Sequence, residues 1–199
     1  GLTLATVGVV SSFVIHARDM YSNRKTDGGA EFVVHSIEPP RFDGNVTDLL
    51  NGSYSVSYTP TFSLHTELRV QLASVNVHHI GGSPFGTDIR TSELSALQSG
   101  GYSWASADGL TIATSGIKSQ FVVHARDVYN NVMTANDVQL YIRMTRDGDA
   151  VPVSIERTTD GSGDHLCSAT PTKSGTYSLS IMVAKAAGIN GTLVLHDYS

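Results

Sequence analysis

Histidine, serine and aspartate are the residues of this sequence whose types could support catalysis, because a hydrolase needs a nucleophile, a base and an orienting acid held together. The chain of 199 residues contains eight histidines. It contains no Gly-x-Ser-x-Gly elbow, no His-Glu-x-x-His, no P-loop and no dinucleotide-binding glycine pattern. We therefore expect a protein that is not an enzyme, with no catalytic residues and no cofactor.

The histidines and acidic residues do not predict a metal site either. His78 and His79 are adjacent in the sequence, so on a strand their side chains point to opposite faces and cannot bind one ion together. Asp160, Asp164 and the turn at residues 146–149 lack the dense carboxylate spacing of a calcium site.

Two further features could carry chemistry, and we interpret both as structural. His-Ala-Arg-Asp occurs twice, at residues 16–19 and 124–127. We expect Asp19 and Asp127 to accept hydrogen bonds from the backbone of the following turn, with His and Arg on the outer face of a sheet; a ligand site is the alternative. Cys167 is the one cysteine, which excludes an intrachain disulfide, and we expect a buried, unreactive thiol.

Charge and hydropathy limit the partners. The net charge is −5 and the 13 basic residues are scattered, so no cationic stripe is available for nucleic acid. No apolar run approaches the roughly 20 residues that span a bilayer, so no direct membrane insertion is expected. Asn45, Asn51 and Asn190 begin Asn-x-Ser/Thr sequons, which favours a secreted or cell-surface protein over a cytoplasmic one.

The sequence repeats itself over the length of a whole domain. Residues 1–23 align without a gap with residues 109–131 at an offset of 108, and 15 of the 23 positions are identical. A spacing of 108 matches one β-sandwich of about 100 residues rather than a solenoid unit. Two domains are therefore predicted.

Alternating apolar residues within each repeat are typical of half-buried strands, and no amphipathic helical stretch of useful length is present. The fold class is all-β, with two tandem antiparallel β-sandwiches at residues 1–93 and 107–199 and a short linker at 94–106. The predicted inward residues are Phe13, Ile15 and Ala17 with Phe121, Val123 and Ala125; Tyr54, Val56 and Tyr58 with His165, Cys167 and Ala169; and Leu68, Val70 and Leu72 with Leu179, Ile181 and Val183.

Residues between these strands indicate where the chain turns and where strand pairing stops. In the second domain VQLYIRMT and AVPVSIERT flank residues 146–149, where Asp-Gly favours a tight hairpin turn. In the first domain Pro39 and Pro40 cannot donate ladder hydrogen bonds, so strand pairing should stop before Pro39. Within the linker, the pair Gly100-Gly101 gives flexibility; a docked linker and a free one both remain open, since Leu94, Leu97, Tyr102 and Trp104 could hold it against one domain.

The chain resembles the filamin-type immunoglobulin-like repeat, the filamin/ABP280 repeat family. The first domain carries the Gly-Leu opening, then F-x-V/I-x-A-x-D-x-x-x-N at residues 13–23, N-G-x-Y-x-V-x-Y-x-P-T at 51–61 and H-I-G-G-S-P-F at 79–85. The second domain matches at residues 109–110, 121–131, 170–172 and 174–177, but Leu193 and Val194 stand where Pro84 and Phe85 do. The first domain departs in turn, with Leu64 and Thr66 at the positions of Gly175 and Tyr177.

The resemblance implies a non-enzymatic module for protein interaction, adhesion or spacing, cut from a larger multi-repeat protein. In this family a peptide strand, or a neighbouring repeat, adds to the edge between strands C and D. A cytoskeletal or ciliary scaffold is the alternative, and a carbohydrate-binding accessory module is a weaker one; partner identity and oligomeric state stay open. The first-domain edge would be residues 32–35. The implied groove of the second domain, the better candidate, is lined by Gln139, Tyr141, Arg143, Thr145, Val151, Val153 and Ile155.

Overall fold

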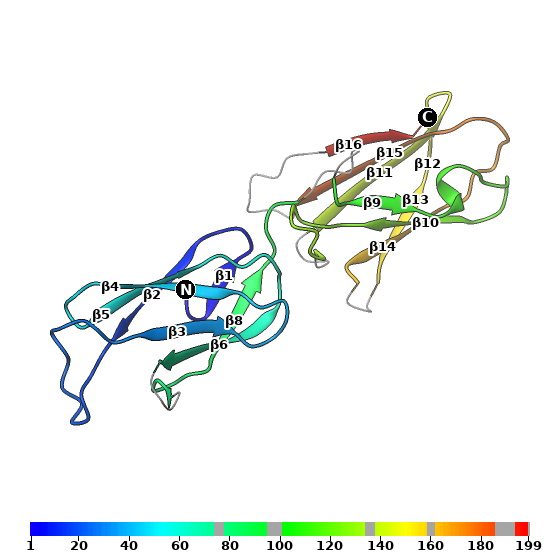
Figure 1. Cartoon of the computed structure of the whole chain (residues 1–199). Coiled ribbons are helices and arrows are strands. Elements are labelled where there is room, and N and C mark those ends of the chain that lie inside the picture. Colours follow the sequence, from blue (N-terminus) through cyan, green and yellow to red (C-terminus); the bar gives the residue numbers. More distant parts are fainter. Residues whose placement is uncertain (74–77, 95–100, 134–137, 159–161, 186–193, 199) are drawn as a thin grey trace. The chain divides into compact units, whose positions relative to one another are not determined.

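Figure 1 shows a computed structural model of the chain, which describes residues 1–73, 78–94, 101–133, 138–158, 162–185 and 194–198. The chain forms two compact units, Gly1–Thr91 and Ser92–Ser199. Within the described residues, every regular element is a strand except the 3₁₀ turn η1 (Asp108–Leu110). No helix in these ranges is long and apolar enough to cross a membrane.

The first unit is a sandwich whose two sheets are joined by one strand. β4 pairs with β3 through Asp43 and Gly44 and then with β5 from Asn45 to Asp48, so the order is β1-β8-β6-β3-β4-β5-β2, with β7 on β6. The strands are β1 (Leu4–Thr6), β2 (Ser11–His16), β3 (Phe32–Ser36), β4 (Asp43–Asp48), β5 (Ser53–Tyr58), β6 (His65–Leu72), β7 (His78–His79) and β8 (Phe85–Arg90). β3 ends at Ser36, ahead of Pro39, as the two prolines that follow it predict.

One pairing in the first unit is parallel. β1 lies alongside β8 with Leu4 opposite Asp88, whereas the other pairings of its described strands are antiparallel. The Thr87 hydroxyl donates to the Leu2 carbonyl at 2.6 Å, which ties the start of the chain to β8 as well.

The second unit has two separate four-stranded sheets, β13-β14-β10-β9 and β12-β11-β15-β16. The all-β fold of two tandem sandwiches is thereby confirmed. The strands are β9 (Trp104–Ser106), β10 (Ser119–His124), β11 (Val138–Arg146), β12 (Asp149–Val151), β13 (Val153–Arg157), β14 (Asp164–Ala169), β15 (Ser178–Lys185) and β16 (Val194–Tyr198).

Each unit has its own core, and most of the residues that the alternating pattern predicted to point inward are buried in it. Phe121, Val123 and Cys167 are buried in the second unit, as Tyr54 and Val56 are in the first. Burial of each Val or Phe side chain among them contributes about 1.5–3 kcal/mol of hydrophobic free energy. Leu72 and Phe13 are only partly buried; Phe13 packs against the core of the first unit from its margin.

Two sequence expectations need correction. The predicted hairpin is shorter than expected, because β12 ends at Val151 and the chain crosses at Pro152 to β13, which pairs with β14 in the other sheet. Part of the expected linker is a strand, since Trp104–Ser106 pairs with β10. Leu94 also bridges to Asp127 and packs on the core of the second unit. Leu97 and Gly100 lie outside the described residues.

Candidate functional site

The edge strand β11 has one side that is open over most of its length. On one side it pairs with β15 from Val138 to Thr145. On the other side β12 pairs only with Met144, Thr145 and Arg146. Among the described residues, nothing pairs with the second side of residues 138–143, so their outward N–H and C=O groups are available to another strand.

The turn between β11 and β12 determines which residues have these outward groups. Asp147 and Gly148 both have positive φ, 51° and 89°, as a type I′ turn requires. Such a turn closes on a hydrogen-bonded pair, here Arg146 and Asp149, and N–H direction alternates along a strand. Ile142 therefore directs its N–H to the open edge, in phase with Arg146, whereas Tyr141 directs its N–H to β15.

The side chains of β11 alternate between the outer face and the core. Gln139, Tyr141 and Arg143 are exposed, with Tyr141 at 44%. Leu140 and Ile142 are partly buried against the core of the second unit. These two apolar residues, which sequence reasoning missed, have their N–H groups on the open edge and their side chains toward the core. The strict alternation of the strand was the signal that could have identified them.

β13 lies next to β11 as the edge of the opposite sheet. It pairs with β14 on one side, and β11 and β13 contact each other. Val153 is partly buried against the core, as is Val151 on β12, while Ile155 is 39% exposed. The residues that the sequence predicted to line this groove therefore fall into two groups, one on the outer face of β11 and one along the apolar margin between β11 and β13. Thr145 is half-buried and already lies opposite Ala150 of β12.

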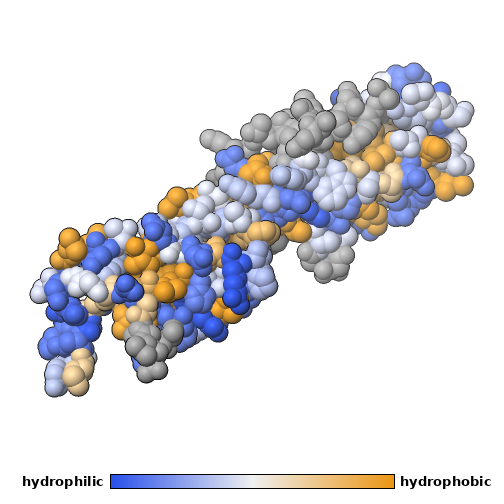
Figure 2. All heavy atoms as spheres, viewed as in Figure 1, coloured by the Kyte–Doolittle hydropathy of each residue, from blue (hydrophilic) through white to orange (hydrophobic). Residues whose placement is uncertain are grey.

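The corresponding edge of the first unit is partly covered. β3 pairs with β6 along its whole length, and Val34 and His35 pair with β4 on the other side. Only Phe32 and Val33 keep an open side among the described strands. On the face that Figure 2 shows, the described residues carry hydrophobic groups in patches among polar ones.

The repeated His-Ala-Arg-Asp motif organises a turn in both units. Asp127 Oδ1 accepts from the N–H groups of Tyr129 and Asn131 at 2.9 and 2.8 Å, and Asp19 accepts in the same way from Tyr21 and Asn23. The predicted role of the two aspartates is thus confirmed. Hydrogen bonds from Asn23, with its side chain contributing most, lower the pKa of Asp19.

The burial of this motif differs between the units. Asp127 is 0% exposed, and its Oδ2 also accepts from the Ser92 N–H at 2.9 Å; Asp19 is exposed. His124 and Arg126 alternate with the buried Val123 and Ala125 and so lie on the outer face, as expected. That face is partly covered, because Trp104 stacks on the His124 ring at 4.4 Å and Arg126 lies 5.0 Å from the indole centre.

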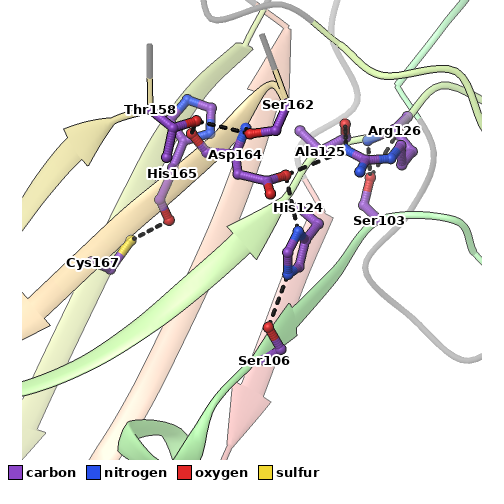
Figure 3. A network of polar contacts seen from close by, with 10 residues as sticks. All are labelled: Ser103, Ser106, His124, Ala125, Arg126, Thr158, Ser162, Asp164, His165 and Cys167. Atoms are coloured by element: carbon purple, nitrogen blue, oxygen red, sulfur yellow. Dashed lines mark hydrogen bonds and ion pairs between the residues drawn. The ribbon is translucent and has the colours of Figure 1, made fainter. Parts of the chain in front are cut away.

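Figure 3 shows a serine, a histidine and an aspartate on three neighbouring strands. Ser106 Oγ lies 2.8 Å from His124 Nε2, and Asp164 Oδ1 lies 2.9 Å from His124 Nδ1. The second contact is a close approach of a carboxylate oxygen to a ring nitrogen, without hydrogen-bond alignment. Because β10 pairs with strands on both sides, its backbone offers no free N–H to an oxyanion there. The arrangement links β9, β10 and β14.

Two buried side chains of β14 lie on the opposite face from Asp164. Cys167 is 0% exposed, and burial raises its pKa to about 12, so the reactive thiolate is strongly disfavoured. His165 is 1% exposed and neither ring nitrogen has a well-aligned hydrogen-bond partner. Burial first, and then the charge of Arg157, lower the pKa of His165.

The remaining predicted positions lie apart from these edges. Asn45 on β4 and Asn51 in the following turn are exposed, and Asn51 Oδ1 accepts from the Ser53 N–H at 3.1 Å. Asn190 and Asp160 lie outside the described residues. The part of the chain that is described contains no cluster of three or more His, Cys, Asp or Glu side chains able to hold a metal ion.

Comparison with known proteins agrees with this architecture. The family model of the filamin/ABP280 repeat matches residues 1–86 and again residues 99–190. The chain belongs to the filamin/ABP280 repeat family. No curated protein sequence matches it. The two filamin repeats therefore correspond to the two units described above.

Solved structures with a similar fold include three bacterial proteins. A bacterial integrin-binding protein, invasin, has a TM-score of 0.59 at 14% identity, over 98% of this chain and 38% of its own. InvD of Yersinia pseudotuberculosis has a TM-score of 0.53 at 18% identity, over 96% and 54%. The Escherichia coli adhesin FdeC has a TM-score of 0.51 at 17% identity, over 98% and 61%. The chain thus spans less than two thirds of each of these structures.

Proposed function

We propose that these two filamin repeats are a non-enzymatic protein-interaction or adhesion module of a larger multi-repeat protein, and that the second repeat binds an extended peptide at the open edge of β11. The observation that carries the proposal is the open side of residues 138–143 next to the edge strand β13. The fold similarity to an integrin-binding protein and an adhesin supports a role in adhesion.

Affinity would come from the main chain. Val138, Leu140 and Ile142 share the phase of Arg146, so each presents one N–H and one C=O to an added strand. A backbone hydrogen bond contributes a net of about 0.5–1.5 kcal/mol, and three residues offer up to six such groups. A short ladder of this kind suffices for weak, reversible binding.

Selectivity would come from the apolar margin. Leu140, Ile142 and Val153 are partly buried, and Ile155 is exposed. A bound strand would place alternate side chains against this margin and the others toward solvent, near Tyr141. The preferred peptide therefore alternates apolar and polar residues.

The test compares two proline substitutions one residue apart. Ile142→Pro removes a donor from the open edge and leaves the β11–β15 ladder intact, whereas Tyr141→Pro removes a donor from that ladder. Peptides selected from a phage-displayed library against the whole chain serve as the probe. Ile142→Ala controls for the lost side chain.

We expect Ile142→Pro to remain folded by circular dichroism and to lose at least about tenfold in peptide affinity, the equivalent of roughly one or two hydrogen bonds. Ile142→Ala should lose less, and Tyr141→Pro should lower the melting temperature instead. Undiminished binding by folded Ile142→Pro would place the peptide site elsewhere. A library that yields no binder at all would refute peptide recognition by this edge.

A further inference from the structure

Strand β4 crosses from one sheet of the first unit to the other, and this crossing leaves a short open edge on β3. Val34 of β3 lies opposite Gly44 of β4. From Asn45 onward β4 pairs with β5 in the other sheet instead. Phe32 and Val33 therefore keep an open side among the described strands, and an open edge exposes unpaired backbone groups.

Asn45 is the residue of β4 that comes next to this open edge. Partners in an antiparallel ladder advance by one residue in opposite directions, so the pair that follows Val34 and Gly44 is Val33 and Asn45. At this point β4 turns to pair with β5, which leaves Val33 without a partner strand. A group attached to Asn45 therefore starts beside the open part of β3.

The side chain of Asn45 points away from the core. A Cβ on Gly44 would lie 2.9 Å from the Cβ of Val34, and Val46 packs against the core of the first unit. Successive residues of a strand face opposite sides, and Asn45 and Thr47 are both exposed. The folded first repeat thus has room for a large group on Asn45.

These same residues form the sequon Asn45-Val46-Thr47. The equivalent position in the second repeat is Ser154, because Asn45 lies opposite Ser57 and Ser154 lies opposite Ser168, at the offset of 111 that aligns β5 with β14. Ser154 begins no sequon. A sequon beside the open edge is therefore a feature of the first repeat and not of the second.

The sequon at Asn51 lies at the other end of β4. Asn51 is in the turn between β4 and β5, where its Oδ1 accepts from the Ser53 N–H at 3.1 Å. β4 leaves β3 at Gly44 and runs toward this turn. A group on Asn51 would therefore start away from the edge of β3.

We propose that Asn45 carries an N-linked glycan that covers the open edge of β3 and closes it to added strands. The Asn45 Nδ2 attacks C1 of the first N-acetylglucosamine of a lipid-diphosphate-linked oligosaccharide in the secretory pathway. A C–N bond forms, the C–O bond to the diphosphate breaks, and Nδ2 loses one proton. The attached glycan is bulky and solubilising. This inference concerns the first repeat, and neither the glycan nor its shielding depends on peptide binding at β11.

The first measurement is the occupancy of Asn45. The chain is secreted from a eukaryotic host with Asn51→Asp and Asn190→Gln, so that Asn45 begins the one remaining sequon; aspartate keeps an acceptor for the Ser53 N–H. Thr47→Ala removes the sequon without changing Asn45, and Thr47→Ser is the matched control that keeps it. We expect the intact mass to show a glycan on the parent and on Thr47→Ser, and none on Thr47→Ala. A parent chain secreted without a glycan would overturn the proposal.

The second measurement is the access of a bulky thiol reagent to the edge. Val33→Cys provides a reactive thiol, because Cys167 is buried. Leu4→Cys is the control, since Leu4 and Val33 are similarly exposed, at 43% and 46%, and β1 is three strands from β3 in the sheet order. Both variants are checked for folding by circular dichroism and labelled with poly(ethylene glycol) maleimide before and after enzymatic release of the glycan.

We expect the glycan to slow labelling of Val33→Cys by about fivefold or more, because a bulky surface group excludes a bulky reagent. Leu4→Cys should react at the same rate with and without the glycan. Equal rates at Val33→Cys in the two forms would overturn the shielding of the edge. Equal slowing at both positions would overturn it too, because the effect would then not be local to β3.

Discussion

Replacing Asp127 by alanine should destabilise the second repeat far more than the equivalent replacement of Asp19 destabilises the first. Asp127 is fully buried and accepts hydrogen bonds from Ser92, Tyr129 and Asn131. The backbone N–H and the side-chain amide of Asn131 are themselves buried. Asp19 makes the corresponding bonds at the surface, where water can replace it.

The expected magnitude follows from the donors left without an acceptor. Each buried donor that loses its partner costs about 1–3 kcal/mol, so the two buried donors of Asn131 give about 2–6 kcal/mol for Asp127→Ala. In a domain of about 100 residues, 1 kcal/mol shifts the melting temperature by roughly 4–8 °C. The second repeat should therefore melt at least about 8 °C lower.

The one tryptophan makes the assay specific to one repeat. Trp104 stacks on His124 in the second unit, so its fluorescence during urea unfolding reports that unit. Calorimetry of the full chain reports both units, and Asp19→Ala is the matched control. Equal losses of stability in Asp127→Ala and Asp19→Ala would refute this prediction, because burial of the motif would then not strengthen its hydrogen bonds.

Three further predictions follow from the second unit. Cys167 should resist thiol reagents without denaturant, and Cys167→Val should be nearly neutral whereas Cys167→Asp should prevent folding of that unit; rapid labelling would contradict this. The pKa of His165 is lowered in the folded state, so the unfolded state binds more protons at acidic pH. The stability of the second unit should therefore fall as the pH drops below about 6.5. His165→Leu should remove this component of the pH dependence of unfolding, as followed by the fluorescence of Trp104. A fragment that begins at Ser92 should melt higher than one that begins at Ser103, because Ser92 donates to Asp127; equal melting temperatures would show that this contact is dispensable.

The alternation of apolar and polar residues predicted the strands in the middle of each repeat. The alternation around Val56 and Cys167 identified β5 and β14, because a half-buried strand must alternate, and both residues are fully buried. β9 was not predicted as a strand. Its three residues are too few to show a period.

The polar contacts around His124 depend on the register in which neighbouring strands pair. The alternation of apolar and polar residues along one strand does not specify that register. Ser106, His124 and Asp164 meet only because β9 and β14 pair with β10 in one particular alignment. The outward direction of the Ile142 N–H likewise follows from the two-residue turn at Asp147 and Gly148. The residues of the β11 edge were named correctly as a strand, but their role in binding stays a prediction.

The parallel pairing of β1 with β8 has a mechanical consequence for a repeat in a chain under tension. β1 stands at the start of the first unit and β8 at its end, and the two strands run in the same direction. A force that pulled the two ends of the unit apart would act along these strands in opposite senses. The bonds between them, which include Val7 N–H to the Arg90 carbonyl at 3.0 Å and Asp88 N–H to the Thr3 carbonyl at 3.0 Å, would be loaded in shear and would have to break together rather than one after another.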